Sequence, residues 1–298
     1  MSAIIENDNT LRAPRLEVAF ASTTAEIVET QKLRYRIFAG ELGAQIDGGA
    51  EGIDHDVFDH YCRHLLVRDT ATGQVVACTR ILTGSRAPDA GGFYSESEFD
   101  LSMLDALPGR FTVPERSEAG AEAAGLPTSR THSRYARSSV SVDSRIMEIG
   151  RTCVDRNYRS GAAITTLWSG IAAFVTTHRY DYLFGCASIG LEDGGATAHA
   201  ILASIRSRAM APDYQRVRPF IPLPASDSRI THKPKMPPLL KAYISLGAKA
   251  CGEAYWDRDF NCADVFMLLN VSDLNPRYAR HFLERNADTA APHHTLLA

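Results

Sequence analysis

The sequence has few of the features that mark a membrane-spanning, secreted or metal-dependent protein. Its 298 residues contain no apolar run of about 18 residues, so we predict no transmembrane helix. The N-terminal residues do not show a basic segment followed by an apolar one, as a secretory signal would. The six cysteines include no Cys-x-x-Cys pair, so we expect no metal site. These absences predict a cytoplasmic protein whose thiols stay reduced.

An excess of charge of either sign is also missing. The chain has 32 basic and 35 acidic residues and a net charge of −3, which is too near neutrality for a general nucleic-acid binder. Hydrophobic residues make up 45% of the chain, enough for a large core. Large apolar residues are scarce at 109–143, which we expect to be a flexible insert. We therefore predict one domain at 15–285 that carries this insert, between tails at 1–14 and 286–298.

Apolar residues recur with strand and helix periods along most of the chain. Leu16, Val18 and Phe20 alternate with other residues as in a strand, and Ser22 or Thr23 is a suitable helix cap. Further strands are expected at 64–68, 75–82, 182–189 and 263–270, and further helices at 196–210, 239–250 and 276–283. The order of these elements predicts an α/β fold with a mixed sheet.

The stretch 147–168 combines a buried strand, a polar turn and the start of an apolar helix. Gly161, Ala162 and Ala163 stand where this helix begins. Small residues there let a ligand approach backbone N–H groups that have no partner within the helix, and such donors favour a phosphate. An ordinary packing joint between a strand and a helix has the same pattern. The residues alone therefore leave both interpretations open.

Two segments of this stretch, EIGRTCV at 148–154 and YRSGAA at 158–163, resemble the acyl-donor-binding core of the GNAT N-acyltransferases. The loop of that family usually reads Gln/Arg-x-x-Gly-x-Gly/Ala, whereas Tyr158 holds its first position here and Arg159 follows one place late. The resemblance implies a GNAT-like mixed central sheet flanked by helices, in which two central strands splay apart. It also implies that the donor's own 4′-phosphopantetheine arm lies in the opening, so that no separate cofactor is needed. The residues that would bind the donor are Thr152, Cys153, Val154, Arg159, Gly161, Ala162 and Ala163.

Other similarities narrow the function. The segments LRYRIF at 33–38 and DVFD at 56–59 are similar to the N-terminal signature of acyl-homoserine-lactone synthases. Segments at 182–188, 237–241 and 260–264 look more like the ornithine N-acyltransferases, which make lyso-ornithine lipid from ornithine and a 3-hydroxyacyl carrier protein. The resemblance implies transfer of a 3-hydroxyacyl group from acyl carrier protein to the α-amine of L-ornithine. A lipid product also implies peripheral contact with the inner face of the membrane.

Three other functions remain open from the sequence. Acylation of another amino acid, such as glycine, would keep the chemistry and change the acceptor. Synthesis of an acyl-homoserine lactone is weakened by the ornithine-type segments in the C-terminal part and by the length of the chain. A non-catalytic module that binds acyl carrier protein or lipid would share the fold without turnover.

Acyl transfer to an amine needs a base close to the nucleophile. Glu148 lies on the central strand, where several GNAT enzymes carry a carboxylate base. Burial beside apolar neighbours would raise its pKa into a useful range. The alternative is a structural carboxylate that pairs with Arg151.

An ornithine acceptor needs an acidic partner for its side-chain amine and a basic partner for its carboxylate. Asp56 and Asp59 have the charge that suits the amine, and Arg80 or Arg151 the charge that suits the carboxylate. Arg34, in the segment that resembles the lactone synthases, would help to close the substrate pocket. The alternative is a charged network that locks the N-terminal loop. The full set assigned to the acceptor is Arg34, Phe38, Asp56, Asp59, Arg80 and Arg151.

The segment 206–241 is basic, with only Asp213 and Asp227 opposing its arginines and lysines. A solvated surface is the simplest interpretation. Acyl carrier proteins are strongly acidic, so the segment also suits docking of a carrier, and anionic lipid headgroups would fit as well. The residues assigned to carrier docking are Arg216, Arg218, Lys233 and Lys235.

Overall fold

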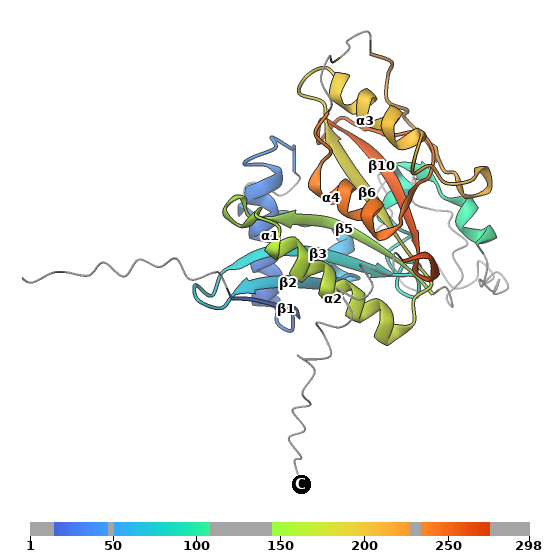
Figure 1. Cartoon of the computed structure of the whole chain (residues 1–298). Helices are drawn as coiled ribbons and strands as arrows, with labels where there is room; N and C mark the ends of the chain where they lie inside the picture. The colour runs from blue at the N-terminus through green and yellow to red at the C-terminus, as the bar shows by residue number, and fades with distance from the viewer. Residues whose placement is uncertain (1–14, 47–50, 108–144, 227–229, 231–233, 275–298) are drawn as a thin grey trace, which may run out of the picture.

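A single eight-stranded sheet forms the centre of the molecule (Figure 1). The computed structural model describes residues 15–46, 51–107, 145–226, 230 and 234–274; the expected tails, insert and helix at 276–283 lie outside these residues. The strands follow the order β1-β2-β3-β5-β6-β10-β8, and β9 pairs with β10. The bounds are β1 (Leu16–Phe20), β2 (Arg63–Asp69), β3 (Val75–Thr83), β5 (Ile146–Val154), β6 (Tyr182–Gly190), β8 (Lys249–Ala250), β9 (Tyr255–Asp257) and β10 (Cys262–Asn270). Only β5 and β6 run parallel, so the sheet is mixed as predicted.

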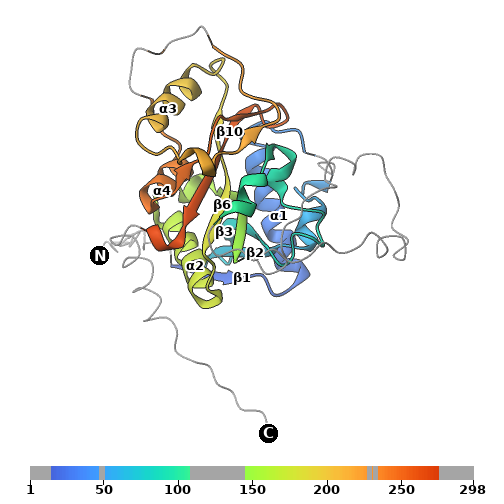
Figure 2. The ribbon, with the colours of Figure 1, turned by 90° about the vertical axis from the view of Figure 1, so that its right-hand side faces the viewer.

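Helices cover both faces of this sheet (Figure 2). The α-helices are α1 (Thr24–Phe38), α2 (Ala162–His178), α3 (Ala196–Arg206) and α4 (Pro238–Leu246). Neighbouring residues of β2 show the division between the faces. Leu66 packs in the same cluster as Leu33 of α1, whereas Leu65 belongs to the large core that α2 and α4 cover. Because side chains alternate along a strand, α1 and α2 lie on opposite faces.

The start of α1 follows directly from its sequence. Thr23 accepts a hydrogen bond from the N–H of Glu26, and the Glu26 carboxylate accepts one in return from the N–H of Thr23. This capping box pairs backbone donors that the helix itself leaves unpaired. The prediction of a cap at Ser22 or Thr23 is confirmed, with Thr23 in that role.

The two central strands separate after a short parallel stretch, as expected. Each strand has nine residues, yet only Ile146–Glu148 of β5 pairs with the matching residues of β6. Gly185 follows on β6, and a Cβ atom there would stand 2.2 Å from the carbonyl oxygen of Ile149. On the other side of β5 the register with β3 shifts beside Arg151, whose φ is 51°. This bulge turns β5 away from regular pairing at the point where the opening begins.

Two helix predictions were wrong in detail. The helix expected at 239–250 ends at Leu246, because Gly247 adopts a left-handed conformation (φ 108°) that caps it, and the following Lys249–Ala250 forms β8. The helix expected at 196–210 ends at Arg206. A short 3₁₀ helix at Val57–His60 lies between α1 and β2. None of the described helices is long and apolar enough to cross a membrane.

Candidate active site

A pocket opens where β5 and β6 separate. It is lined by β5, by β6, by the 3₁₀ helix Tyr94–Ser97 and by the segment that includes β9 and the start of β10. Some residues that were assigned a role from the sequence also line this pocket, namely Phe38, Arg80, Glu148, Arg151 and Thr152. Its charged lining consists of four carboxylates and two guanidinium groups, those of Glu98, Glu148, Asp257, Asp264, Arg80 and Arg151.

Glu148 points from β5 into this pocket and is almost fully buried. Its Oε1 accepts hydrogen bonds from the N–H of Ser95 (2.9 Å) and from the Ser95 hydroxyl (2.5 Å), and its Oε2 accepts one from the N–H of Tyr94 (2.8 Å). Burial raises the pKa of Glu148, and the hydrogen bonds from Ser95 and Tyr94 oppose part of that rise. This rise in pKa agrees with the expectation from the sequence that burial would raise the pKa of Glu148. Glu148 makes no ion pair with Arg151, which was the structural role considered from the sequence. Its structural role is instead to accept hydrogen bonds at the start of the 3₁₀ helix Tyr94–Ser97.

A buried charged network lies beside the pocket. Arg34 is 1% exposed and pairs with Asp54 (Nε to Oδ2, 2.8 Å) and with Asp59 (Nη1 to Oδ1, 2.6 Å). Burial raises the pKa of Asp59, but the guanidinium groups of Arg34 and Arg80 outweigh it and hold that pKa well below its usual range. These ion pairs agree with the alternative of a charged network at the N-terminal loop, and the acceptor roles given to Arg34 and Asp59 stay predictions. Sequence reasoning missed Asp54, which lies 20 residues from its partner.

Arg80 and Arg151 extend this network to the pocket wall. Arg80 donates to Asp56 at 2.6 Å and lies 3.5 Å from Asp59. Arg151 lies 3.3 Å from Asp54 and 3.6 Å from Asp56, but its buried Nε makes no hydrogen bond. The Arg151 guanidinium lies 5.0 Å from the ring centres of both Tyr94 and Phe260. Arg151 therefore lines the pocket while its guanidinium stays paired with the carboxylates of this network.

Phe38 and Asp56 occupy positions beside these groups. Phe38 packs edge-on against Phe260, with ring centres 5.8 Å apart, and both rings line the pocket. Asp56 begins the 3₁₀ helix Val57–His60, where its Oδ1 accepts from the N–H of Phe58. Its Oδ2 is buried without a hydrogen bond. The acceptor roles given to Phe38, Asp56 and Asp59 stay predictions.

Three further carboxylates meet on the other side of the pocket. Glu98 and Asp264 are each 4% exposed, and Asp257 is 9% exposed. Burial, together with the neighbouring charge of Asp264, raises the pKa of Glu98 well above its usual range. Burial also raises the pKa of Asp264 to about 6, although the Ser188 hydroxyl donates to it at 2.6 Å. None of the three residues was assigned a role from the sequence.

The helix that follows β5 starts as the glycine pattern predicted. Gly161 takes a left-handed conformation (φ 108°) and α2 begins at Ala162, with no side chain capping its first N–H groups. These donors are therefore free to meet an anion. Arg159 is half-exposed beside them, but it donates to the Val154 carbonyl oxygen and to Glu41. Tyr158, at the position that is usually Gln or Arg, donates its hydroxyl to Asp69 at 2.8 Å.

The buried thiols near the site are poor nucleophiles. Cys153 is 5% exposed, and its Sγ lies 3.6 Å from that of Cys78. Burial is the largest cause that raises the pKa of Cys153, and for Cys186 burial acts together with the charge of Glu98. The thiolate form that attacks a thioester is thus disfavoured at both residues.

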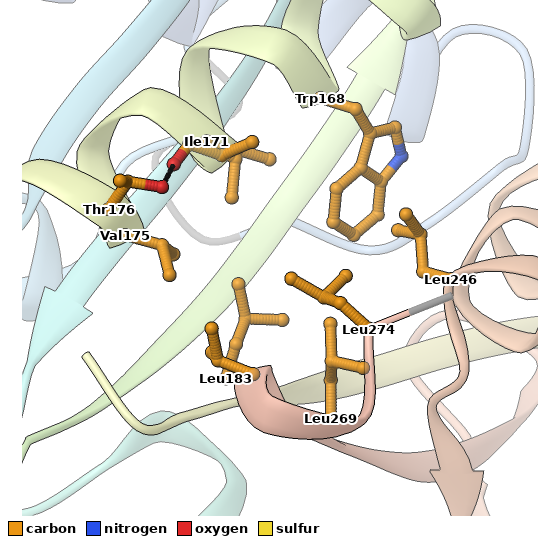
Figure 3. A pocket seen from close by; sticks show the side chains of 10 residues that line it. Trp168, Ile171, Val175, Thr176, Leu183, Leu246, Leu269 and Leu274 are labelled. Atoms are coloured by element: carbon orange, nitrogen blue, oxygen red, sulfur yellow. Dashed lines mark hydrogen bonds between the residues drawn. The ribbon is translucent and has the colours of Figure 1, made fainter. Parts of the chain in front are cut away.

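A second pocket lies between α2, α4, β6 and β10, and its lining is almost entirely hydrocarbon (Figure 3). Trp168 and Leu183 border it, together with Leu246, Leu269 and Leu274. The Thr176 hydroxyl on its wall is already bonded to the Ala172 carbonyl oxygen. Helix α4 borders both pockets, because Leu239 near its start lines the first and Leu246 at its end lines the second. This pocket is suited to an apolar chain.

The residues assigned to carrier docking lie on a different part of the fold from Gly161. Arg218 is exposed on β7 (Arg218–Pro219), which pairs with β4 (Phe99–Asp100) outside the main sheet. Arg216 is exposed and pairs with Asp213 at 2.9 Å. Lys235 is described in an irregular segment, whereas Lys233 lies outside the described residues. The large side chains of Tyr214 and Phe220 are also exposed in this segment.

The bulge on β5, the opening beside it and the uncapped start of α2 define an acyltransferase of the GNAT class. A family model described as "Acetyltransferase (GNAT) domain" matches residues 33–119 and 113–169. The chain belongs to the family of L-ornithine N(alpha)-acyltransferases. It is 31% identical over 288 residues to the member from Brucella abortus (strain 2308), covering 91% of this chain and 90% of that protein. It is 32% identical over 287 residues to the member from Agrobacterium fabrum (strain C58), covering 91% of this chain and 86% of that protein.

The chain also aligns with solved structures at low sequence identity. The acyl-homoserine-lactone synthase LasI aligns with a TM-score of 0.44 and 11% identity, over 91% of this chain and 96% of LasI. FeeM, an N-acyl amino acid synthase from uncultured soil microbes, aligns with a TM-score of 0.42 and 12% identity, over 88% of this chain and 93% of FeeM.

Proposed function

We propose that this protein transfers a 3-hydroxyacyl group from acyl carrier protein to the α-amine of L-ornithine, which gives lyso-ornithine lipid in the first step of ornithine lipid synthesis. The observation that carries the proposal is the buried carboxylate of Glu148, at the bottom of a pocket formed by the splayed strands β5 and β6. The curated relatives that cover most of the chain are named for the same acceptor. The acyl carrier protein as donor is our own inference from the class of reaction.

In this mechanism Glu148 removes the proton that makes the α-amine an ammonium ion. The free lone pair of the nitrogen then attacks the thioester carbon, a C–N bond forms, and the C–S bond breaks. The nitrogen then loses a second proton, the departing thiolate takes up that proton, and Glu148 releases the first one to solvent, so the products are an amide and a thiol. The backbone N–H groups of Thr152, Cys153 and Val154, beside the bulge, are our candidates for binding the pantetheine amides or the thioester oxygen.

Arg151 is the group that suits the carboxylate of the acceptor. It lines the pocket from the same strand as Glu148, and its Nε has no hydrogen bond. The planar guanidinium of an arginine binds a carboxylate in a fixed orientation, and here the acceptor would share it with Asp54 and Asp56. Such binding would place the α-amine, which is attached to the same carbon as the carboxylate, near Glu148.

The function is tested by supplying the purified protein with 3-hydroxyacyl carrier protein and a mixture of free amino acids, and by identifying the products by mass. We expect hydroxyacyl-ornithine as the main product. A different acyl-amino acid would contradict the acceptor assignment, and a homoserine lactone formed when S-adenosylmethionine is also supplied would favour the lactone synthases. If the protein bound the carrier and released no free thiol, it would be a binding module.

The pocket between α2 and α4 is our candidate for the end of the acyl chain. Ala172 lines it from α2 and is partly exposed, so a larger side chain there would fill the pocket without disrupting the core. We expect Ala172→Phe to lower kcat/KM for a long-chain donor by roughly tenfold, because each lost apolar contact weakens binding. The same variant should use a donor of eight carbons as well as the wild type does. Equal losses for both donors would rule out this pocket as the chain site.

The exposed basic side chains of Arg216, Arg218 and Lys235 are our candidates for the surface that docks the carrier protein. We expect replacement of Arg216, Arg218 and Lys235 by Glu to raise KM for the acyl carrier protein by about tenfold, since exposed charges at the rim of an interface mainly govern association. An acyl-pantetheine donor, which lacks the carrier protein, is the matched control, and its KM should not change. An unaltered KM for the carrier would remove this surface from the account.

A further inference from the structure

The pocket holds more acidic side chains than the proposed chemistry uses. Glu148 serves as base, yet Glu98, Asp257 and Asp264 line the same pocket. A carboxylate O of Asp257, the Cys262 Sγ and a carboxylate O of Asp264 all lie within 4.8 Å of one another. In the described part of the chain no Lys, Arg or His nitrogen forms an ion pair with any of these three carboxylates. Burial raises the pKa of Glu98 and of Asp264, so without a cation these groups tend to hold a proton, whereas a cation bound between them would favour their charged form.

Glu98 is the least satisfied of the three carboxylates. It is 4% exposed, and its carboxylate has one hydrogen-bond partner, the weakly donating thiol of Cys186 at 3.3 Å. A carboxylate can accept about four hydrogen bonds. The remaining lone pairs of Glu98 therefore lack donors in a pocket that a ligand can enter.

The other two carboxylates differ in how much bonding capacity remains. Asp257 accepts from the N–H groups of Asp259 and Phe260, which fixes it as the cap of a turn. Asp264 accepts from the Ser188 hydroxyl at 2.6 Å and from the Cys262 thiol at 3.8 Å, and has no charged partner. Glu98 and Asp264 are thus the pair with capacity for a cation. Asp257 adds to the negative field around them.

A chain of contacts connects this pair to the base. The Ser95 hydroxyl donates to Glu148 and lies 3.4 Å from the Cys186 Sγ, which in turn contacts Glu98. The base and the acid pair are therefore neighbours along one wall of the pocket. An acceptor held at Glu148 by its α-amine would direct its side chain toward Glu98 and Asp264.

We propose that Glu98 and Asp264 bind the side-chain ammonium group of the amino-acid acceptor and so select ornithine over neutral amino acids. This inference rests on the proposed function and names the residues that would set its specificity. The three N–H donors of an ammonium group match the free acceptors of the two carboxylates. A neutral side chain would leave both carboxylates buried without a partner, and the site would therefore reject it.

The test compares ornithine with norvaline, which has the same carbon chain without the side-chain amine. We expect the wild-type protein to favour ornithine by about 100-fold or more in kcat/KM, and Glu98→Gln and Asp264→Asn to reduce this preference to about tenfold or less. The loss should lie in KM for ornithine, and norvaline should react no more slowly with the variants. Asp259→Asn removes an exposed carboxylate near the pocket and is the control that keeps the preference.

A second measurement does not depend on turnover. We expect ornithine, but not norvaline, to raise the melting temperature of the wild-type protein by several degrees, since a ligand that binds only the folded state stabilises it. Neither Glu98→Gln nor Asp264→Asn should show this shift, and in the absence of ligand each should melt no lower than the wild type. An unchanged preference for ornithine in both variants, or the absence of an ornithine-specific shift in the wild type, would overturn the inference. Stabilisation by ornithine without acyl transfer would instead contradict the proposed function alone.

Discussion

Replacement of Glu148 by Gln is expected to lower kcat by about 10²–10⁴-fold, the range that a positioned general base contributes. The amide cannot accept the proton that the α-ammonium group must lose. Gln also keeps the size of the side chain and one acceptor oxygen for Ser95. The measurement is single-turnover transfer from a 3-hydroxyacyl carrier protein to ornithine, with carrier binding measured in parallel. We expect carrier binding to stay unchanged.

The structural role of Glu148 can be separated from its chemical role. Gln would lose one of the hydrogen bonds from Tyr94 or Ser95, so some loss of thermal stability is expected in either case. Ser95→Ala provides the matched control, because it removes a hydrogen bond that lowers the pKa of Glu148 and leaves the carboxylate in place. A base works only when ionised, so kcat/KM should fall as pH decreases through this pKa, and in Ser95→Ala that fall should begin at a higher pH. A Glu148→Gln protein that is less stable but fully active would show that Glu148 is only structural.

Replacement of Arg34 by Met should cause the largest loss of stability. The side chain is 1% exposed and joins Asp54 and Asp59, so its removal leaves two buried carboxylates without their main cation. Breaking a buried ion pair in this way costs about 3–5 kcal/mol of unfolding free energy. The free energy of unfolding of both proteins would be measured with denaturant at pH 7. Arg34→Lys is the control, and it should be intermediate because it keeps the charge without the bidentate geometry.

The pH dependence of this effect has a definite sign. The pKa of Asp59 is depressed in the folded protein by Arg34 and Arg80. Its contribution to stability is therefore fully present above the pKa of an unfolded Asp, about 3.9, and is lost as pH falls below that value. The difference between wild type and Arg34→Met should accordingly be largest near neutral pH and become smaller in acid. A difference below about 1 kcal/mol at pH 7 would mean that the network does not stabilise the fold.

Local patterns in the sequence were sufficient for most of the fold. The cap at Thr23, the alternation in β1 and the glycine at the start of α2 act over a few residues, so the sequence predicts them directly. The C-terminal end of α4 was misjudged, since apolar residues continue past Leu246 into β8. Gly247, which ends the helix in a left-handed conformation, was the signal that could have corrected the prediction.

The candidate site was predictable only in part. Glu148 and Arg151 lie on the strand that carries the family resemblance, and the pocket contains both. Asp264 had a visible signal, because it is a single carboxylate in the otherwise apolar strand Cys262–Asn270. Glu98 had none, since it lies among several acidic residues at 96–100 and enters the pocket through the packing of distant segments. Contacts between segments of this kind depend on the tertiary fold, which local patterns do not encode.

The position of the new amide bond tests the central claim most directly. Ornithine labelled with ¹⁵N in its side-chain amine would be acylated by the wild-type protein, and the product would be fragmented in a mass spectrometer. The account places the side-chain ammonium at Glu98 and Asp264 and the α-amine at Glu148, so the acyl group should be on the unlabelled α-nitrogen. An acyl group on the labelled nitrogen would contradict this arrangement of the acceptor and the assignment of Glu148 as its base.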